Sequence, residues 1–200
     1  MKQPILIIVP PLGTSSYKIG EKITKNWEKD FGIKPINWQF FWQDSGDSYE
    51  VRLKQLVDKI DELSNNDNTI VSLLGLSGGG SVVFNAFCKR KDKISKVINV
   101  GGRLKNGNIR FPESKSKNDN NFLFKESVTQ CEKNIGLLDV NDKNKILTVR
   151  PLWDEYAPVE FAMVDGVKNI QIVAVEHVLG ILLSMTIYKK IIIDFLNGKG

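Results

Sequence analysis

The stretch that decides the fold reads Thr69-Ile-Val-Ser-Leu-Leu-Gly75-Leu-Ser77-Gly-Gly79-Gly-Ser-Val-Val83. A run of β-branched and aliphatic residues leads into the pattern Gly-x-Ser-x-Gly, and an apolar helical pattern follows it. This order is typical of a nucleophile elbow, a sharp strand-to-helix turn that presents one serine hydroxyl at the end of a sheet. Such a turn is strained and crowded, so small residues are expected at Gly75 and Gly79, where a Cβ would clash.

Other structures also use glycine-rich turns of this kind. A phosphate-binding loop at a helix N-terminus is one alternative, but the Walker pattern needs Gly-Lys-Ser/Thr and no lysine follows these glycines. The dinucleotide fingerprint Gly-x-Gly-x-x-Gly is missing from the stretch as well. A purely structural glycine-rich turn stays open, so the elbow needs support from the rest of the chain.

The composition is that of one globular domain of 200 residues, with 42% hydrophobic and 26% charged residues. The net charge of +5 comes from scattered lysines, whereas a nucleic-acid partner would need a basic face interleaved with aromatic residues. The two cysteines, Cys88 and Cys131, cannot form a disulfide framework and have no metal-ligand spacing. We therefore expect a cytoplasmic protein with no nucleic-acid partner, no cofactor and no metal.

Two apolar segments near the ends of the sequence could be taken for targeting or membrane segments. The run at 5–9 is too short for the apolar region of a signal peptide and is better interpreted as a buried strand. The segment 178–196 is broken by Lys189, Lys190 and Asp194, and its apolar residues recur at helical spacing. A docked core helix is expected there, not a membrane span.

Strand and helix patterns alternate along the chain, which predicts a three-layer α/β/α sandwich with a mostly parallel sheet. The expected strands are 5–9, 33–42, 69–74, 97–100, 146–149 and 170–175. The expected helices are one that ends at Gly32, one that follows the capping-box pattern at 47–50, one after the elbow, and a long one from about 178.

One segment, 103–145, interrupts this alternation. It is polar, rich in Asn, Lys and Ser, and contains Phe111, Phe122 and Phe124. A loop of that length is uncommon in a compact domain unless it is functional or mobile, and this one lies where parallel sheets bind ligands. We interpret it as a partly ordered lid or cap at about 103–145 within a single domain, 1–200. A disordered surface insertion is the alternative.

A serine hydroxyl becomes a good nucleophile only when a base takes its proton, and the base is usually a histidine oriented by a carboxylate. The chain has one histidine, His177, which directly follows the strand expected at 170–175. It therefore lies at the carboxyl end of a strand, on the same edge of the sheet as Ser77.

The orienting carboxylate is expected at another strand end, between the serine and the histidine in chain order. Asp154 is the first carboxylate beyond the strand at 146–149, and Glu155 is its nearest rival. Asp165 and Glu176 fit this position less well.

The chain resembles the α/β-hydrolases over most of its length, from Ile5 to the final helix. The motifs that carry the resemblance are Gly75-Leu-Ser77-Gly-Gly79, Asp154 followed by Ala-Pro-Val, and Val175-Glu-His177. Their order, Ser then Asp then His, is that of the family. The resemblance implies that Ser77 is the nucleophile, His177 the general base and then acid, and Asp154 its orienting partner. The family's full sheet begins with two further strands, so the chain is similar to the small, trimmed members.

The resemblance also implies an oxyanion hole made of two backbone amides. One would come from Gly78, the residue after the nucleophile, and the other from the loop Pro10-Pro-Leu-Gly13. Family members often carry His-Gly at the start of that loop. Here Pro10-Pro11 stands in its place, and because proline has no N–H, we assign the second donor to Leu12.

Dehalogenases and epoxide hydrolases of this fold have an aspartate where this chain has Ser77, so the serine indicates acyl transfer. We expect a serine hydrolase of the carboxylesterase or thioesterase type, which forms an acyl-enzyme with a small acyl substrate. Trp42, Trp153 and Tyr156 lie at or beyond strand ends, where they could line an apolar pocket or be ordinary core and rim residues. The alternative function is a non-catalytic ligand- or partner-binding module, because a fold does not by itself determine function.

Overall fold

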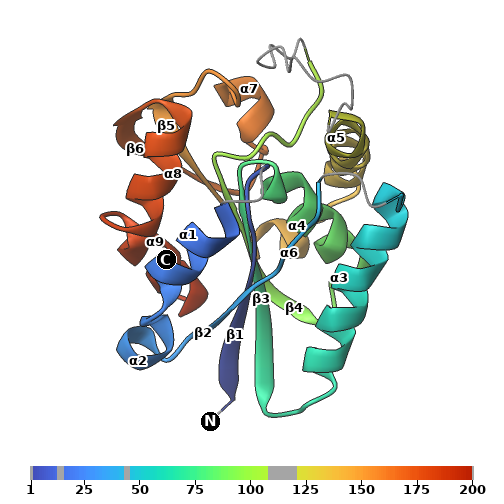
Figure 1. Ribbon diagram of the computed structural model, residues 1–200, viewed down its shortest axis with the longest axis vertical. Helices are drawn as coiled ribbons and strands as arrows, with labels where there is room; N and C mark the ends of the chain where they lie inside the picture. The colour runs from blue at the N-terminus through green and yellow to red at the C-terminus, as the bar shows by residue number, and fades with distance from the viewer. Residues whose placement is uncertain (1, 13–15, 43–45, 108–120, 200) are drawn as a thin grey trace.

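The computed structural model of the chain places one six-stranded sheet between two layers of helices (Figure 1). The structure describes residues 2–12, 16–42, 46–107 and 121–199. The strands are β1 (Gln3–Val9), β2 (Lys34–Asn37), β3 (Thr69–Leu76), β4 (Ile94–Val100), β5 (Ile146–Trp153) and β6 (Lys168–Val175). The helices are α1 (Ser16–Thr24), α2 (Trp27–Phe31), α3 (Tyr49–Ser64), α4 (Gly79–Lys89), α5 (Asn121–Ile135), α6 (Val140–Lys143), α7 (Val159–Ala162), α8 (His177–Met185) and α9 (Lys189–Leu196).

The strands lie in the order β2-β1-β3-β4-β5-β6, and each neighbouring pair is parallel. The predicted fold class, an α/β sandwich built on a parallel sheet, is confirmed. Because every strand runs the same way, all six carboxyl ends lie at one edge of the sheet, and the loops that follow them meet there.

Both faces of the central strands are covered, which explains their nearly unbroken apolar sequences. One face packs against α3, α4 and α5, and the other against helices from the two ends of the chain, α2, α8 and α9 (Figure 1). In β1, Ile7 belongs to the first cluster and its neighbours Leu6 and Ile8 to the second. The alternation of side chains along a strand thus places successive apolar residues in different layers.

Two helices expected to be continuous are each divided in the structure. The one that ends at Gly32 forms α1 and α2, separated at 25–26 by Lys-Asn, and asparagine favours caps and turns over helix interiors. The last one forms α8, which ends with Thr186 as its C-cap, and α9, which begins after Tyr188. Within the described residues, every helix is too short or too polar to cross a bilayer.

The strand expected at 33–42 pairs only over Lys34–Asn37. Its partner β1 ends at Val9, and Pro10 and Pro11 follow, so the ladder has no further hydrogen-bonding strand. The rest of the segment still contributes to the core, because Phe40 and Trp42 are buried against each other, with ring centroids 4.6 Å apart.

The segment 103–145 is more ordered than its polar composition suggested. Helix α5 packs against α4 and buries Phe124, Val128 and Cys131, so this part is not a structureless loop. Its apolar residues recur at 124, 128 and 131 among polar neighbours, which is a helical pattern that the overall composition concealed. Residues 108–120, including Phe111, lie outside the described residues, and a lid there stays a prediction.

The elbow glycines give a test of how tightly β1, β3 and α4 are packed. A Cβ on Gly79 would lie 2.2 Å from the carbonyl oxygen of Val9, which is backbone and cannot rotate away. We expect Gly79→Ala to lower the free energy of unfolding by about 1–3 kcal/mol, the usual cost of overpacking a core. Urea denaturation followed by circular dichroism measures it.

Gly136→Ala is the matched control, because a Cβ there would meet nothing nearer than 3.4 Å. If the two variants proved equally stable, the described packing of the elbow against β1 would be wrong.

Candidate active site

Ser77 occupies the turn between β3 and α4, as the Gly-x-Ser-x-Gly pattern predicted. Its φ is +50°, a left-handed conformation that costs a non-glycine residue about 1–3 kcal/mol. Two backbone hydrogen bonds hold it there: the N–H of Ser77 donates to the carbonyl of Val100 at 2.9 Å, and the N–H of Gly80 donates to the carbonyl of Ser77 at 2.9 Å. The side chain is left pointing away from the strand, toward the carboxyl edge of the sheet.

His177 lies directly opposite this hydroxyl, although it is 100 residues further along the chain. It is the first residue of α8, two positions after the end of β6, and it is buried. The distance between Ser77 Oγ and His177 Nε2 is 2.7 Å, which is a normal hydrogen bond. The structure therefore brings these two predicted residues together at one edge of the sheet.

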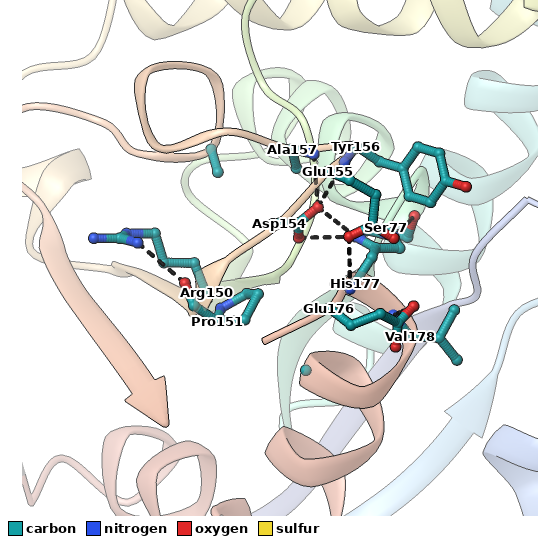
Figure 2. A network of polar contacts seen from close by, with 12 residues as sticks. Ser77, Arg150, Pro151, Asp154, Glu155, Tyr156, Ala157, Glu176, His177 and Val178 are labelled. Atoms are coloured by element: carbon teal, nitrogen blue, oxygen red, sulfur yellow. Dashed lines mark hydrogen bonds and ion pairs between the residues drawn. The ribbon is translucent and has the colours of Figure 1, made fainter. Parts of the chain in front are cut away.

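Asp154 lies on the other side of the imidazole, one residue beyond the end of β5 (Figure 2). His177 Nδ1 is 2.8 Å from Asp154 Oδ2 and 3.0 Å from Oδ1. The amides of Tyr156 and Ala157 donate to Oδ1 at 2.9 and 2.8 Å, which fixes the plane of the carboxylate. An ionised carboxylate only accepts hydrogen bonds, so Nδ1 carries the proton and the lone pair of Nε2 faces Ser77.

The surroundings of Asp154 favour its ionised form. Burial alone would raise the pKa of this carboxyl, but the hydrogen bond and charge of His177 and the amides of Ala157 and Tyr156 outweigh it. The pKa of Asp154 therefore lies below its ordinary value of 3.8. At neutral pH the site therefore holds a buried negative charge, and both carboxylate oxygens lie within hydrogen-bond distance of the His177 ring.

The other carboxylates considered from the sequence have different roles. Glu155 accepts a hydrogen bond from the backbone N–H of His177 at 3.2 Å and so supports the residue, not its ring. Glu176 caps α8 by accepting from the amides of Val178 and Leu179, and these bonds lower its pKa. Asp165 lies exposed in the turn before β6. Among the four candidates, Asp154 alone is hydrogen-bonded to the imidazole within the described part of the chain.

Two further residues lie next to the imidazole: Gly101, which was not predicted at the site, and Tyr156, which was predicted as a possible pocket residue. Gly101, just after β4, has φ +61°, and a Cβ there would lie 3.7 Å from both Asp154 Oδ2 and His177 Cε1. The ring of Tyr156 meets that of His177 edge-on, with centroids 5.3 Å apart. For Gly101, the available sequence signal was the pair Gly101-Gly102 at the end of a strand. That pair indicated where the strand ends, but not that Gly101 lies beside the imidazole.

The two expected oxyanion donors lie side by side. The side chain of Leu12 comes within 2.9 Å of the position that a Cβ on Gly78 would occupy. Nothing in the described chain accepts a hydrogen bond from the backbone N–H of either residue. Gly13, from the same loop, lies outside the described residues. Their assignment as oxyanion donors stays a prediction.

The aromatic residues expected at strand ends have different environments. Trp42 is buried, and its ring packs edge-on against Phe124, with centroids 5.9 Å apart. Trp153 is 59% exposed, and Tyr156 is partly exposed beside His177. Trp42 is thus a core residue that also borders Gly78. In the described segments, no three His, Cys, Asp or Glu side chains gather as metal ligands.

Comparison of the sequence finds no matching family model and no matching curated protein. The structure is similar to several solved hydrolases. Est1E from Butyrivibrio proteoclasticus is 15% identical, with a TM-score of 0.68 over 99% of this chain and 88% of its own. The monoacylglycerol lipase of Paleococcus ferrophilus is 14% identical, with a TM-score of 0.67 over 100% and 97%. An esterase domain from Rhodothermus marinus is 13% identical, with a TM-score of 0.65 over 98% and 89%. At these identities the likeness establishes the fold, which is that of the α/β-hydrolases.

The lowered pKa of Asp154 makes a prediction about acid stability. A carboxyl whose pKa is lower in the folded than in the unfolded chain stabilises the fold above its unfolded pKa, and this contribution is lost as the pH falls through the folded pKa. We expect Asp154→Asn to be less stable than wild type near neutrality, by about 1–3 kcal/mol for a buried charged hydrogen bond. The difference should shrink below about pH 4, the ordinary range of an aspartate.

Urea denaturation of both proteins at neutral and acidic pH measures this difference. Asp165→Asn is the control, because it removes one exposed carboxylate outside the site. A stability difference between wild type and Asp154→Asn that does not change with pH would contradict the prediction.

Proposed function

We propose that this chain is a serine hydrolase that cleaves a carboxylic ester or thioester through an acyl-enzyme on Ser77. The observation that carries the proposal is the unbroken hydrogen-bond chain from Ser77 Oγ through the His177 ring to Asp154. The strained backbone of Ser77 supports it, because strain of this kind concentrates at functional sites. The fold supports it as well, since this is the edge at which parallel α/β sheets bind ligands.

In the proposed acylation step, Ser77 Oγ attacks the carbonyl carbon of the substrate while His177 Nε2 takes the hydroxyl proton. The imidazolium that forms is stabilised by Asp154, which stays ionised throughout. As the tetrahedral intermediate collapses, the bond from the carbonyl carbon to the leaving oxygen or sulfur breaks. His177 passes its proton to that atom, and an alcohol or thiol departs.

Deacylation repeats the same steps with water as the nucleophile. His177 Nε2 takes a proton from the water as its oxygen attacks the acyl carbon, and then returns a proton to Ser77 Oγ. The products are a carboxylic acid and the free enzyme. In both halves of the reaction, the amides of Gly78 and Leu12 would donate to the developing oxyanion. Electrostatic stabilisation of this kind is usually the largest single contribution to catalysis.

The side chains near the site favour an apolar acyl substrate. Leu12 and Tyr156 are both at least one-third exposed, and they adjoin Gly78 and His177 respectively. Apolar side chains around a few convergent polar groups are typical of small-molecule sites. The solved structures similar to this chain include a lipase for monoacylglycerols, an esterase domain and Est1E with bound ferulic acid. A small ester or thioester with an apolar acyl group fits these observations best.

A fluorophosphonate probe tests the nucleophile. Its electrophilic phosphorus reacts with an activated serine, so wild type should be labelled and Ser77→Ala should not.

Removing the nucleophile or the base of such a triad typically lowers the rate by several powers of ten, so hydrolysis of p-nitrophenyl esters should fall to near background in both Ser77→Ala and His177→Asn.

Ser95→Ala is the control for labelling, because Ser95 lies on β4 near the end of the strand remote from the site. Equal labelling of wild type and Ser77→Ala would overturn the proposal. A wild type that binds acyl esters saturably but neither reacts with the probe nor turns them over would favour the non-catalytic binding module instead.

The oxyanion assignment has its own test in the loop after β1. Leu12→Pro removes the backbone N–H that we assign as a donor, and the loss of one oxyanion donor lowers kcat by about 10²–10³-fold. Leu12→Ala keeps the N–H and shortens the side chain, so its kcat should stay within about tenfold of wild type. A loss of kcat that occurs only in the proline variant would be due to the missing N–H and not to the side chain. Steady-state kinetics with a chromogenic ester, after circular dichroism has confirmed folding, distinguishes the two. Similar losses in both variants would argue against Leu12 as a donor.

A further inference from the structure

One face of the last two strands of the sheet is uncovered toward their carboxyl ends. Only 14 residues connect β5 to β6, and the only helix among them is α7, which has four residues. Such a short helix cannot cover a strand of eight residues. Parallel sheets normally have both faces buried, so the outer face of β6 is an exception within this fold.

The exposed side chains toward the carboxyl end of that face are apolar, and they follow a polar pair, Gln171 and Arg150, which are hydrogen-bonded to each other. Along β6, Ile172 and Ala174 are buried in the cluster that includes α8 and α9, whereas Val173 and Val175 alternate with them and are 79% and 61% exposed. At the end of the neighbouring strand β5, where the pairing with β6 is irregular, Leu152 and Trp153 are 53% and 59% exposed, and Trp153 pairs with Val175. We call these four exposed side chains, Leu152, Trp153, Val173 and Val175, the β5–β6 patch.

The backbone beside this patch also lacks a neighbouring strand. In the described chain, β6 is the last strand of the sheet and pairs only with β5. Proteins usually protect such an edge with prolines or with charges along the strand, because its unpaired N–H and C=O groups readily bind another strand. From 169 to 175, β6 has neither. An apolar edge with free hydrogen-bonding groups indicates that its partner is itself a β-strand.

We propose that the edge of β6 and the β5–β6 patch bind a second copy of this chain, with the two β6 strands antiparallel across a twofold axis. The charges at the ends of the strand favour this partner. Lys168 begins β6 and Glu176 follows it, and no other charged residue lies between them. Antiparallel pairing brings Lys168 of each copy toward Glu176 of the other, so the strand is complementary to itself.

Interfaces of standard size cover roughly 800 Å² on each partner, which is more than four side chains supply. Helix α8 packs against β5 and β6 and exposes Val178, Leu179 and Leu182. These residues provide further apolar surface on the opposite side of the sheet from the β5–β6 patch. The interface would then continue the sheet through the twofold axis and bury apolar side chains beside the paired strands, an isologous arrangement typical of homodimers.

Size-exclusion chromatography with multi-angle light scattering tests the proposal on the full chain. We expect wild type to be a dimer at micromolar concentration. Val173→Lys should be a monomer, with a dissociation constant raised by at least about 100-fold because two charges would be buried without partners. Val140→Lys is the matched control: Val140 is a valine of similar exposure, 74%, on α6, and its substitution should leave the dimer intact.

A charge reversal tests the antiparallel orientation. Lys168→Glu would place like charges at both ends of the paired strands, so its dimer should be weaker than that of wild type, and more so at low salt. Val173→Lys and Lys168→Glu change surface residues. The thermal unfolding temperature of each variant should therefore match that of wild type measured at a concentration low enough for wild type to be monomeric. A wild type that is monomeric up to about 100 μM, at the weak end of specific association, would overturn the proposal. So would a dimer that persists in Val173→Lys. The readout is molecular mass, so neither result depends on the proposed chemistry.

Discussion

The parallel direction of the six strands is the constraint on which the site depends. The carboxyl ends of β3, β5 and β6 lie at the same edge of the sheet. The parallel strand direction therefore brings a residue just after each of these strands to that edge. Ser77, Asp154 and His177 each stand one or two positions beyond a strand. The distances of 2.7 and 2.8 Å among their side chains, across 100 and 23 residues of sequence, follow from sheet topology combined with local turns.

The sheet topology brings Ser77, His177 and Asp154 together, and hydrogen bonds then stabilise their arrangement. A buried carboxylate next to a buried imidazole would be costly if either were left without partners. Here Asp154 accepts from two amides of its own loop as well as from His177, and the ring nitrogen that remains faces Ser77. The strained conformation of Ser77 is held in the same way, by the carbonyl of Val100 on the adjacent strand. In the proposed mechanism, the neighbouring backbone holds these groups in place before any substrate binds.

The sequence predicted that Ser77, Asp154 and His177 would meet, because each of them is identified by its immediate neighbours along the chain. Ser77 is identified by its glycine neighbours, and Asp154 and His177 by their places after apolar strands, so the fold class and the meeting of these side chains could be predicted together. Gly101 could not be assigned to the site, because its role depends on where α8 places the imidazole. Helix α5 was missed for a related reason. Its apolar stripe is narrow, and only contact with α4 shows that Phe124 belongs to the core.

The loop after β1 shows how an unusual sequence can still fit the proposed chemistry. Pro10 and Pro11 remove two amides that could have served as donors, yet they also fix two φ angles in the chain that leads to Leu12. The carbonyl oxygens of Val9 and Pro10 lie 2.2 and 3.0 Å from the position of a Cβ on Gly79, so the end of β1 is pressed against the elbow itself. A stiff segment in that place holds the next free amide, that of Leu12, beside the start of α4. In the proposed oxyanion hole, the rigidity of the two prolines thus compensates for the hydrogen-bond donors that they lack.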